Sequence, residues 1–306
     1  MKNINRFLLL LFSIFFTLSI GNPFVYASEN DHNEKVINEK YGPTIVVLGE
    51  RLSESQREET KRLLKVDEEA DVKEIIVTGA DAAKYINGDP NSNMYSSAKI
   101  KRLDKGEGIT VVQATPENIT EVTDEMYANA LITAGVEDAE ITVASPVKVT
   151  GHSALTGIFK AYEATGEELD TARLDVANQE LDLSTKLAEE AGVDENQVSQ
   201  LMTEIKKAIA EQDPATKEEV KQIVEEQLKK LNIEIPDEYK QMLIHLFDQI
   251  RNLNINFDEL KSQLNQLTNV IKDKLGEVDP NVFAKIWNSL KDIFMAIVNF
   301  FNNLLS

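Results

Sequence analysis

The chain has 306 residues, with 52 acidic and 32 basic side chains and a formal net charge of −20. Such an acidic surface disfavours nucleic acid, whose phosphates require clustered lysine and arginine. It also disfavours electrostatic binding to anionic lipid or wall polymers, unless divalent cations bridge them. There are no cysteines, so neither disulfides nor thiolate metal sites stabilise the fold. A chain of this length with 42% hydrophobic residues can build a sufficient core without them.

The N-terminus has the pattern of a cleavable secretory signal. Lys2 and Arg6 precede an apolar run over residues 7–20, and small residues follow at the positions that signal peptidase reads before a cut after Ala27. The run is shorter than the roughly 20 residues of a membrane-spanning helix, so a retained anchor is the less favoured interpretation. Residues 1–27 are therefore predicted to be a signal peptide.

Residues 28–41 are predicted to be a polar linker, because they show no apolar periodicity, and His32 within them is expected to be solvated. Residues 42–166 then carry short β-branched runs that predict the strands of an α/β domain. The turn residues 104–107 indicate that the third and fourth of these strands form a hairpin. The expected strands are residues 44–49, 72–79, 97–103, 108–114 and 140–145.

Helix signals lie between these strands. Ser53 or Ser55 is placed to cap a first helix. Thr123 begins a second helix that Gly135 ends, and residues 154–164 form a third. Two stretches share one order, in which the end of a helix is followed by valine, an acidic spacer and a strand. This repetition predicts a twofold β-α-β arrangement with helices packed on a mixed sheet.

An all-α region is predicted over residues 167–276. Two helices, each with one apolar stripe, are expected at residues 198–209 and 220–231. Residues 243–271 keep an apolar spacing of three and four, which is typical of a coiled-coil seam. A capping box beginning at Asn256 can divide this stretch into two helices. Connections marked by proline favour packing of these helices within one chain over self-association.

An amphipathic helix is predicted over residues 277–306, with Asp279 as its cap and Pro280 as its first residue. Its polar face is too extensive for a membrane span. Either its apolar stripe closes the helical bundle, or the helix lies flat on a membrane with its tryptophan at the level of the headgroups. The first interpretation is favoured, because amphipathic helices of globular proteins mostly bury their stripe internally. The candidate residues for membrane or partner binding are Phe283, Trp287, Leu290, Phe294, Phe300 and Phe301.

Three segments of the chain carry a family resemblance. They are TIVVLGERLSESQ at residues 44–56, TDEMYANALITAGVEDAEITVASPVKVTGHSALTGIFKAYE at residues 123–163, and LNINFDELKSQL at residues 253–264. Together they resemble the YpuA-like family of exported proteins from Firmicutes, which is defined as a domain of unknown function. The resemblance implies an extracytoplasmic envelope protein of a Gram-positive bacterium. It supplies neither a reaction nor catalytic residues.

The segment GHSAL contains the catalytic candidates, Ser153 and the adjacent His152. A hydrolase nucleophile elbow requires G-x-S-x-G between a strand and a helix, and here leucine stands at the last position. The histidine that follows in the sequence, His245, lies in the predicted all-α region. A simpler interpretation is favoured, in which Gly151 turns the chain and Ser153 or Thr150 caps the next helix.

No metal or cofactor site is predicted. The loop DPNSNMY at residues 89–95 has oxygens at alternate positions, as calcium loops do. However, Met94 stands where such loops have glycine and Ile100 where they have glutamate, so a turn-rich loop is favoured. His245 has no second histidine within two helical turns and is expected to be a partly buried structural residue.

The predicted fold class is α+β, an α/β domain followed by a helical bundle or coiled-coil-like region. Predicted export, the missing catalytic partners and the long apolar seam favour a non-enzymatic envelope protein. Its α/β head and helical stalk would bind a partner protein, a wall component or a membrane. The alternative is a serine-dependent hydrolase that acts on wall or ester substrates through Ser153. A metal-buffering acidic surface is a third hypothesis.

Overall fold

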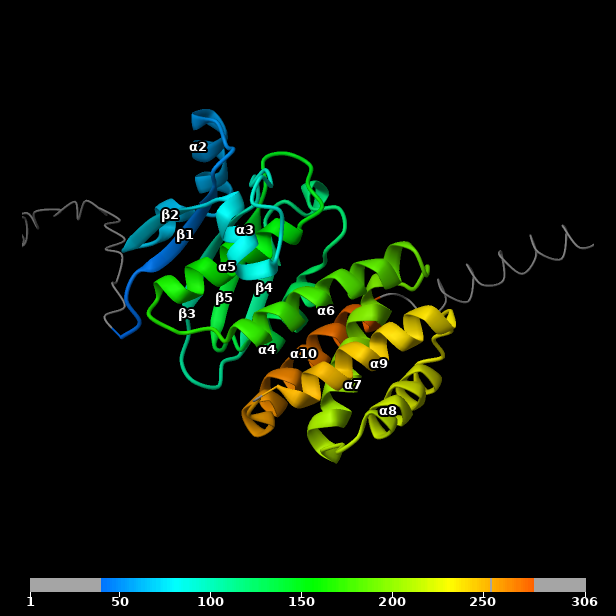
Figure 1. Ribbon diagram of the computed structural model, residues 1–306. Coiled ribbons are helices and arrows are strands. Elements are labelled where there is room, and N and C mark those ends of the chain that lie inside the picture. Colours follow the sequence, from blue (N-terminus) through cyan, green and yellow to red (C-terminus); the bar gives the residue numbers. More distant parts are fainter. Residues whose placement is uncertain (1–39, 254, 278–306) are drawn as a thin grey trace, which may run out of the picture. The chain divides into compact units, whose positions relative to one another are not determined.

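The structure is a computed structural model that describes residues 40–253 and 255–277 (Figure 1). It confirms the α+β class, with a five-stranded mixed sheet followed by helices. The strands are β1 (Thr44–Gly49), β2 (Val72–Val77), β3 (Ser97–Arg102), β4 (Ile109–Gln113) and β5 (Ala139–Ala144). The α-helices are α2 (Glu54–Leu63), α3 (Gly79–Ile86), α4 (Asp124–Ala134), α5 (His152–Ala164), α6 (Thr171–Glu189), α7 (Glu195–Gln212), α8 (Lys217–Lys230), α9 (Asp237–Asn252) and α10 (Phe257–Glu277).

Several predicted features lie outside the described residues. They are the signal peptide, the linker up to residue 39, and the C-terminal helix beyond Glu277 with its aromatic candidates. Within the described ranges, no helix combines the length and the hydropathy that crossing a bilayer requires.

The sheet consists of two parallel pairs on either side of one antiparallel strand. Its order is β2-β1-β3-β5-β4, with β1 parallel to β2 and β4 parallel to β5. β3 runs antiparallel to both of its neighbours. Because α2 connects the first parallel pair and α4 the second, the predicted twofold β-α-β arrangement is confirmed.

The predicted hairpin between β3 and β4 is wrong, because β5 lies between these two strands. The residue before β5 holds the connecting turn. The Asp138 carboxylate accepts hydrogen bonds from the backbone N–H groups of Gly106 (2.9 Å) and Gly108 (2.8 Å). The Asp138 carbonyl accepts a third from the N–H of Leu103 (2.7 Å). The turn between β3 and β4 is therefore hydrogen-bonded to Asp138 at the start of β5, and it does not bring β3 and β4 together as a pair.

The two faces of the sheet are covered unequally. Alternate residues of β1 point to opposite faces, as in any strand. Ile45 and Val47 belong to the large core formed with α3, α4, α5 and the later helices. Val46 and Leu48 belong to a smaller cluster that includes Leu64 at the end of α2. One face is thus continuous with the main core, whereas the other has a small cover.

Helix caps follow the predictions at two sites and depart from them at a third. Ser53 caps α2, and Thr123 caps α4. At α5, however, the cap residue is Gly151 in the left-handed region (φ 111°), and no side chain caps the helix. A Cβ atom at this glycine would lie 2.8 Å from the hydroxyl oxygen of Tyr127. The expectation that Ser153 or Thr150 caps this helix is therefore wrong.

Two helices, α3 and α6, were not predicted, and α6 joins the α/β and helical parts of the chain (Figure 1). It contacts α3, α4 and α5 as well as α7 and α9. One hydrophobic core runs through all of these elements. The predicted boundaries at residues 42, 166 and 276 stay a prediction.

A buried ion pair lies where α4, α6 and α7 meet. Lys206 and Glu180 are each 1% exposed at the side chain, and their charged atoms are 2.6 Å apart. The Lys206 ammonium also donates to the carbonyl of Asn129 (2.7 Å) and to the hydroxyl of Thr133 (3.2 Å). This network fixes the helices against one another through directional contacts inside an apolar core.

The apolar seam predicted over residues 243–271 is divided between two helices. α9 ends at Asn252, and α10 begins at Phe257. α9 packs against α6 and α8, whereas α10 packs against α7 and α4. The seam residues of the described part therefore face neighbours within one chain. The oligomeric state stays a prediction.

Candidate functional site

The sequence-predicted catalytic pair sits at the start of α5, but its two side chains have different partners. The Ser153 hydroxyl donates to the hydroxyl of Ser96 (3.2 Å). The His152 ring faces two carboxylates, with Nε2 at 3.4 Å from Asp182 and Nδ1 at 3.8 Å from Glu121. Burial raises the pKa of the Asp182 carboxyl, and the neighbouring His152 opposes this. The Thr185 hydroxyl also lies 3.4 Å from His152 Nε2. His152 thus faces two carboxylates and a threonine, while Ser153 bonds to Ser96 and not to the imidazole that a serine nucleophile would need.

Two further candidates from the sequence, the loop at residues 89–95 and His245, lie within the described residues. In the loop at residues 89–95, the Asp89 carboxylate accepts from the backbone N–H of Asn91 (2.8 Å), which closes a local turn. Across the described ranges, no group of three or more histidine, cysteine, aspartate or glutamate residues is arranged to hold a metal ion. His245 is exposed on α9, so the expectation of a partly buried histidine is wrong.

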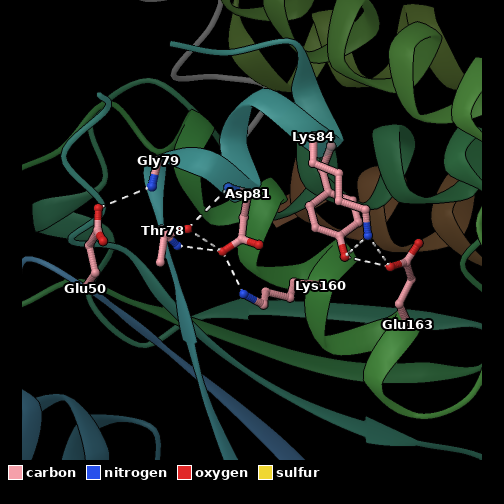
Figure 2. Close-up of polar contacts among 8 residues, drawn as sticks. Glu50, Thr78, Gly79, Asp81, Lys84, Lys160 and Glu163 are labelled. Carbon is pink, nitrogen blue, oxygen red and sulfur yellow. Dashed lines mark hydrogen bonds and ion pairs between the residues drawn. The ribbon is translucent and has the colours of Figure 1, made fainter. Parts of the chain in front are cut away.

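A cluster of polar side chains joins α3 to α5 (Figure 2). The Asp81 carboxylate accepts from the Lys160 ammonium (2.7 Å) and from the hydroxyl of Thr78 (2.8 Å). Burial acts to raise the pKa of Asp81, but these hydrogen bonds outweigh it and hold the pKa below its usual range. The Glu50 carboxylate accepts from the N–H of Gly79 (3.2 Å) at the first turn of α3. Both carboxylates thus satisfy donors at the start of that helix.

A second contact lies farther along the same two helices (Figure 2). The Glu163 carboxylate of α5 accepts from the Lys84 ammonium (2.9 Å) and the Tyr85 hydroxyl (2.6 Å) of α3. Burial opposes ionisation of Glu163, yet the two donors keep its pKa below the usual range. All of these groups pair with one another, so the cluster positions α3 on α5.

A concave surface lies on the thinly covered face of the sheet. We call it the sheet groove. It has a volume of about 740 Å³, with a floor of β3, β4 and β5 and a wall formed by the end of α2 and the turn after it. Val112 on the floor is 48% exposed. The groove is lined by Leu63, Leu64, Lys65, Glu68, Glu69, Lys99, Lys101, Thr110, Val112, Ala114, Glu140 and Thr142.

The wall of the sheet groove is fixed to its floor by one partly buried carboxylate. Glu69 forms an ion pair with Lys99 (2.9 Å) and accepts from the hydroxyl of Thr44 (3.1 Å). Burial opposes ionisation of Glu69, but Lys99 and Thr44 lower its pKa below the usual range. The ion pairs of Lys101 with Glu69 and of Lys65 with Glu68 are longer, at 4.0 and 3.9 Å. The groove therefore presents charges of both signs, with Lys99, Lys101 and Glu140 on its floor beside the uncharged side chains of β4.

A second hollow, the acidic pocket, lies at the carboxyl end of β4 and has a volume of about 450 Å³. Its charged lining residues are Asp124, Glu125 and Glu195. Burial raises the pKa of Glu195, and the neighbouring carboxylates of Asp194 and Glu189 add to this effect. The complete lining is Gln113, Pro116, Ile119, Thr120, Val122, Thr123, Asp124, Glu125, Glu195 and Asn196.

Neither concave surface was predicted from the sequence, because each combines residues that are far apart along the chain. Thr110 and Val112 are exposed and alternate with the more buried Ile109, Val111 and Gln113 along β4. This alternation is the one local signal that β4 has a solvated face. Which wall stands over that face depends on the strand order, and the order differs from the predicted one.

Comparison with known proteins identifies relatives of the chain. Residues 48–267 match the family model described as a protein of unknown function (DUF1002). The protein from Bacillus subtilis (strain 168) described as uncharacterized protein YpuA is 33% identical over 270 residues, which cover 83% of this chain and 90% of that protein. No solved structure matches the chain.

Proposed function

The chain belongs to the DUF1002 family, and from that premise we propose that it is an exported, non-enzymatic cell-envelope protein that binds a polypeptide partner. The observation that supports binding is the sheet groove, which within residues 40–253 and 255–277 is lined by β3, β4, β5 and the segment at the end of α2. Sheet faces are normally covered within the fold. A groove of this volume, with mixed charges and the exposed Val112 on its floor, gives another molecule a concave surface to contact.

The surroundings of Ser153 and His152 support a non-enzymatic role. A hydrolase needs its serine hydroxyl within hydrogen-bond reach of a base. Here Ser153 bonds to Ser96, and the His152 ring faces Asp182 and Glu121. Lys160 and Glu163 attach α5 to α3, and within the described part of the chain the Ser153 hydroxyl bonds to Ser96 and not to His152.

Charge supports a polypeptide over the other partners that the sequence leaves open. A chain with a net charge of −20 repels polyanionic wall polymers and anionic lipid. The sheet groove itself is lined by three lysines and three glutamates around threonine, valine and alanine. Such a mixture complements the side chains of a polypeptide better than a surface of uniform charge.

The test is crosslinking in intact cells followed by recovery of the full-length protein and mass spectrometry. Val112→Asp places a charge on the groove floor. Val270→Asp is the matched control, because Val270 on α10 is also 48% exposed. We expect the enriched partner to fall at least about tenfold for Val112→Asp, which corresponds to about 1.4 kcal/mol, and to be unchanged for Val270→Asp.

Equal recovery of the partner by both variants would contradict binding at the sheet groove. A serine-directed fluorophosphonate probe tests the hydrolase alternative on the same samples. Labelling of the wild-type protein that disappears in Ser153→Ala would contradict the non-enzymatic role, whereas we expect no specific labelling.

A further inference from the structure

The outer edge of β4 is a free edge of the sheet. In the parallel ladder between β4 and β5, Ile109 is paired with Ala139, and the Gly108 carbonyl accepts from the Ala139 N–H (3.0 Å). Alternate residues of β4 therefore bond to β5, and the backbone groups of Ile109 and Val111 point the other way. Within residues 40–253 and 255–277, these outward groups have no hydrogen-bond partner.

The two edges of the sheet differ in how they are protected. β2, at the other end, exposes the charged residues Lys73 and Glu74. Charged side chains are a common device against unwanted strand pairing. β4 has the sequence Ile-Thr-Val-Val-Gln, with no charge, proline or break in its ladder. Its edge is the one suited to pair with another strand.

The acidic pocket lies at the carboxyl end of this edge. The backbone N–H of Gln113, the last residue of β4, donates to the Asp124 carboxylate (3.0 Å). Asp124 thereby ends the row of free backbone groups and also lines the acidic pocket with Glu125 and Glu195. A strand laid along β4 would bring its terminal side chain to a pocket whose charged lining residues are all carboxylates, which favours a cationic side chain there.

We propose that the outer edge of β4 accepts an extended segment of a partner polypeptide as a sixth strand, with a lysine or arginine of that segment in the acidic pocket. This inference rests on the proposed function and names the partner's chemistry. Main-chain hydrogen bonds supply affinity in strand addition, and side-chain pockets supply specificity. A second copy of the chain would bring another net charge of −20 to the same edge, so a basic or neutral partner is favoured.

The probes are fluorescein-labelled heptapeptides of alternating threonine and valine. Each peptide carries one lysine or one glutamate, placed at its N-terminal or at its C-terminal end. Fluorescence anisotropy measures their binding to the full-length protein. Val111→Pro removes an outward N–H that the sheet does not use, and Val111→Ala is the control for the lost side chain. We expect a lysine peptide to bind about tenfold more tightly than its glutamate counterpart, and Val111→Pro to lose about tenfold relative to Val111→Ala.

Glu195→Gln is a second variant, at an acidic-pocket residue outside the sheet, and we expect it to reduce the preference for lysine severalfold. Circular dichroism verifies that each variant is folded. Failure of every peptide to bind the wild-type protein would overturn the proposal, as would equal binding by the two Val111 variants. A dimer in light scattering that Val111→Pro abolishes would also overturn it, because a second copy would then occupy the edge. A partner recovered by crosslinking without peptide binding would contradict only this inference and leave the proposed function standing.

Discussion

Lys206 and Glu180 show how single residues hold the helices together. Both charges are removed from water, which is costly unless the pair is close and its remaining donors are satisfied. Burial lowers the pKa of the Lys206 ammonium, and the Glu180 carboxylate opposes this. The hydrogen bonds to Asn129 and Thr133 supply the additional partners that the ammonium needs. The pair specifies how α6 and α7 sit on α4.

Removing one member of this pair should be more harmful than removing both. We expect Lys206→Met to lower the free energy of unfolding by about 3–5 kcal/mol, because it leaves the Glu180 carboxylate buried and unpaired. The double variant Lys206→Met with Glu180→Leu should regain most of that loss. Urea unfolding of the wild type, of Lys206→Met and of the double variant measures these differences in the free energy of unfolding. A single variant as stable as the wild type would show that water or a rearranged partner already neutralises Glu180.

The ionisation of Asp81 should make the stability of the folded protein depend on pH, in a direction that follows from the lowered pKa of this carboxyl. A carboxyl whose pKa is lower in the folded state stabilises the protein above its unfolded pKa of about 3.9. That contribution is lost as the pH falls through the folded-state pKa. We therefore expect Asp81→Asn to melt at a lower temperature than the wild type at pH 7, with the difference vanishing in acid.

The control for Asp81→Asn is Glu117→Gln, at an exposed carboxylate in the turn after β4. We expect its melting temperature to follow the wild type at every pH. If the Asp81→Asn difference persisted unchanged in acid, the contact with Lys160 would not be the source of the stabilisation.

Local side-chain chemistry predicted some caps well. Ser53 and Thr123 each accept from a backbone N–H within the first turn that follows, which requires only neighbouring residues. Ser153 departs from the pattern because Gly151 is held in a left-handed conformation against Ile119 and Tyr127. That constraint comes from a distant segment, and no local rule contains it.

Among the elements, the strands and most of the amphipathic helices were predictable, whereas α3 and α6 were not. Helix α6 is enclosed on several sides, so its buried positions do not form a single apolar stripe. Glu180, Ser184 and Thr185 are among its buried residues. Because these buried positions are polar, the apolar pattern that would predict a central helix is interrupted in the sequence of α6. The hairpin prediction failed for a similar reason. Backbone N–H groups of the turn donate to the Asp138 carboxylate, which lies outside the two strands that the turn connects.

At the scale of the whole molecule, the candidate site follows from strand order. Placing β4 at the edge of the sheet exposes one side of its backbone, and the small cover over β1 and β2 leaves the sheet groove open. The sequence of β4 predicts a half-solvated strand but not which strand lies beside it. Composition alone was sufficient for the charge argument, since net charge does not depend on the fold.

The apolar stripe predicted beyond Asp279 has little apolar surface to cover on the described part of the molecule. Over residues 40–253, 255–256 and 260–272, the large hydrophobic side chains that remain exposed are Val112 and Val270. We expect this small exposed apolar area to offer the predicted stripe few partners for burial. We therefore expect deletion of residues 280–306 to leave the thermal melting curve unchanged and to abolish binding to neutral phosphatidylcholine vesicles, measured by flotation.

The polar face of this segment has few charges, so binding to vesicles should survive high salt. Phe294→Glu on the stripe should release the protein from vesicles, while Asn299→Glu on the polar face should not. A lower melting temperature after the deletion would instead show that the stripe closes the helical bundle. In that case the segment contributes to stability in the way that amphipathic helices of globular proteins usually do.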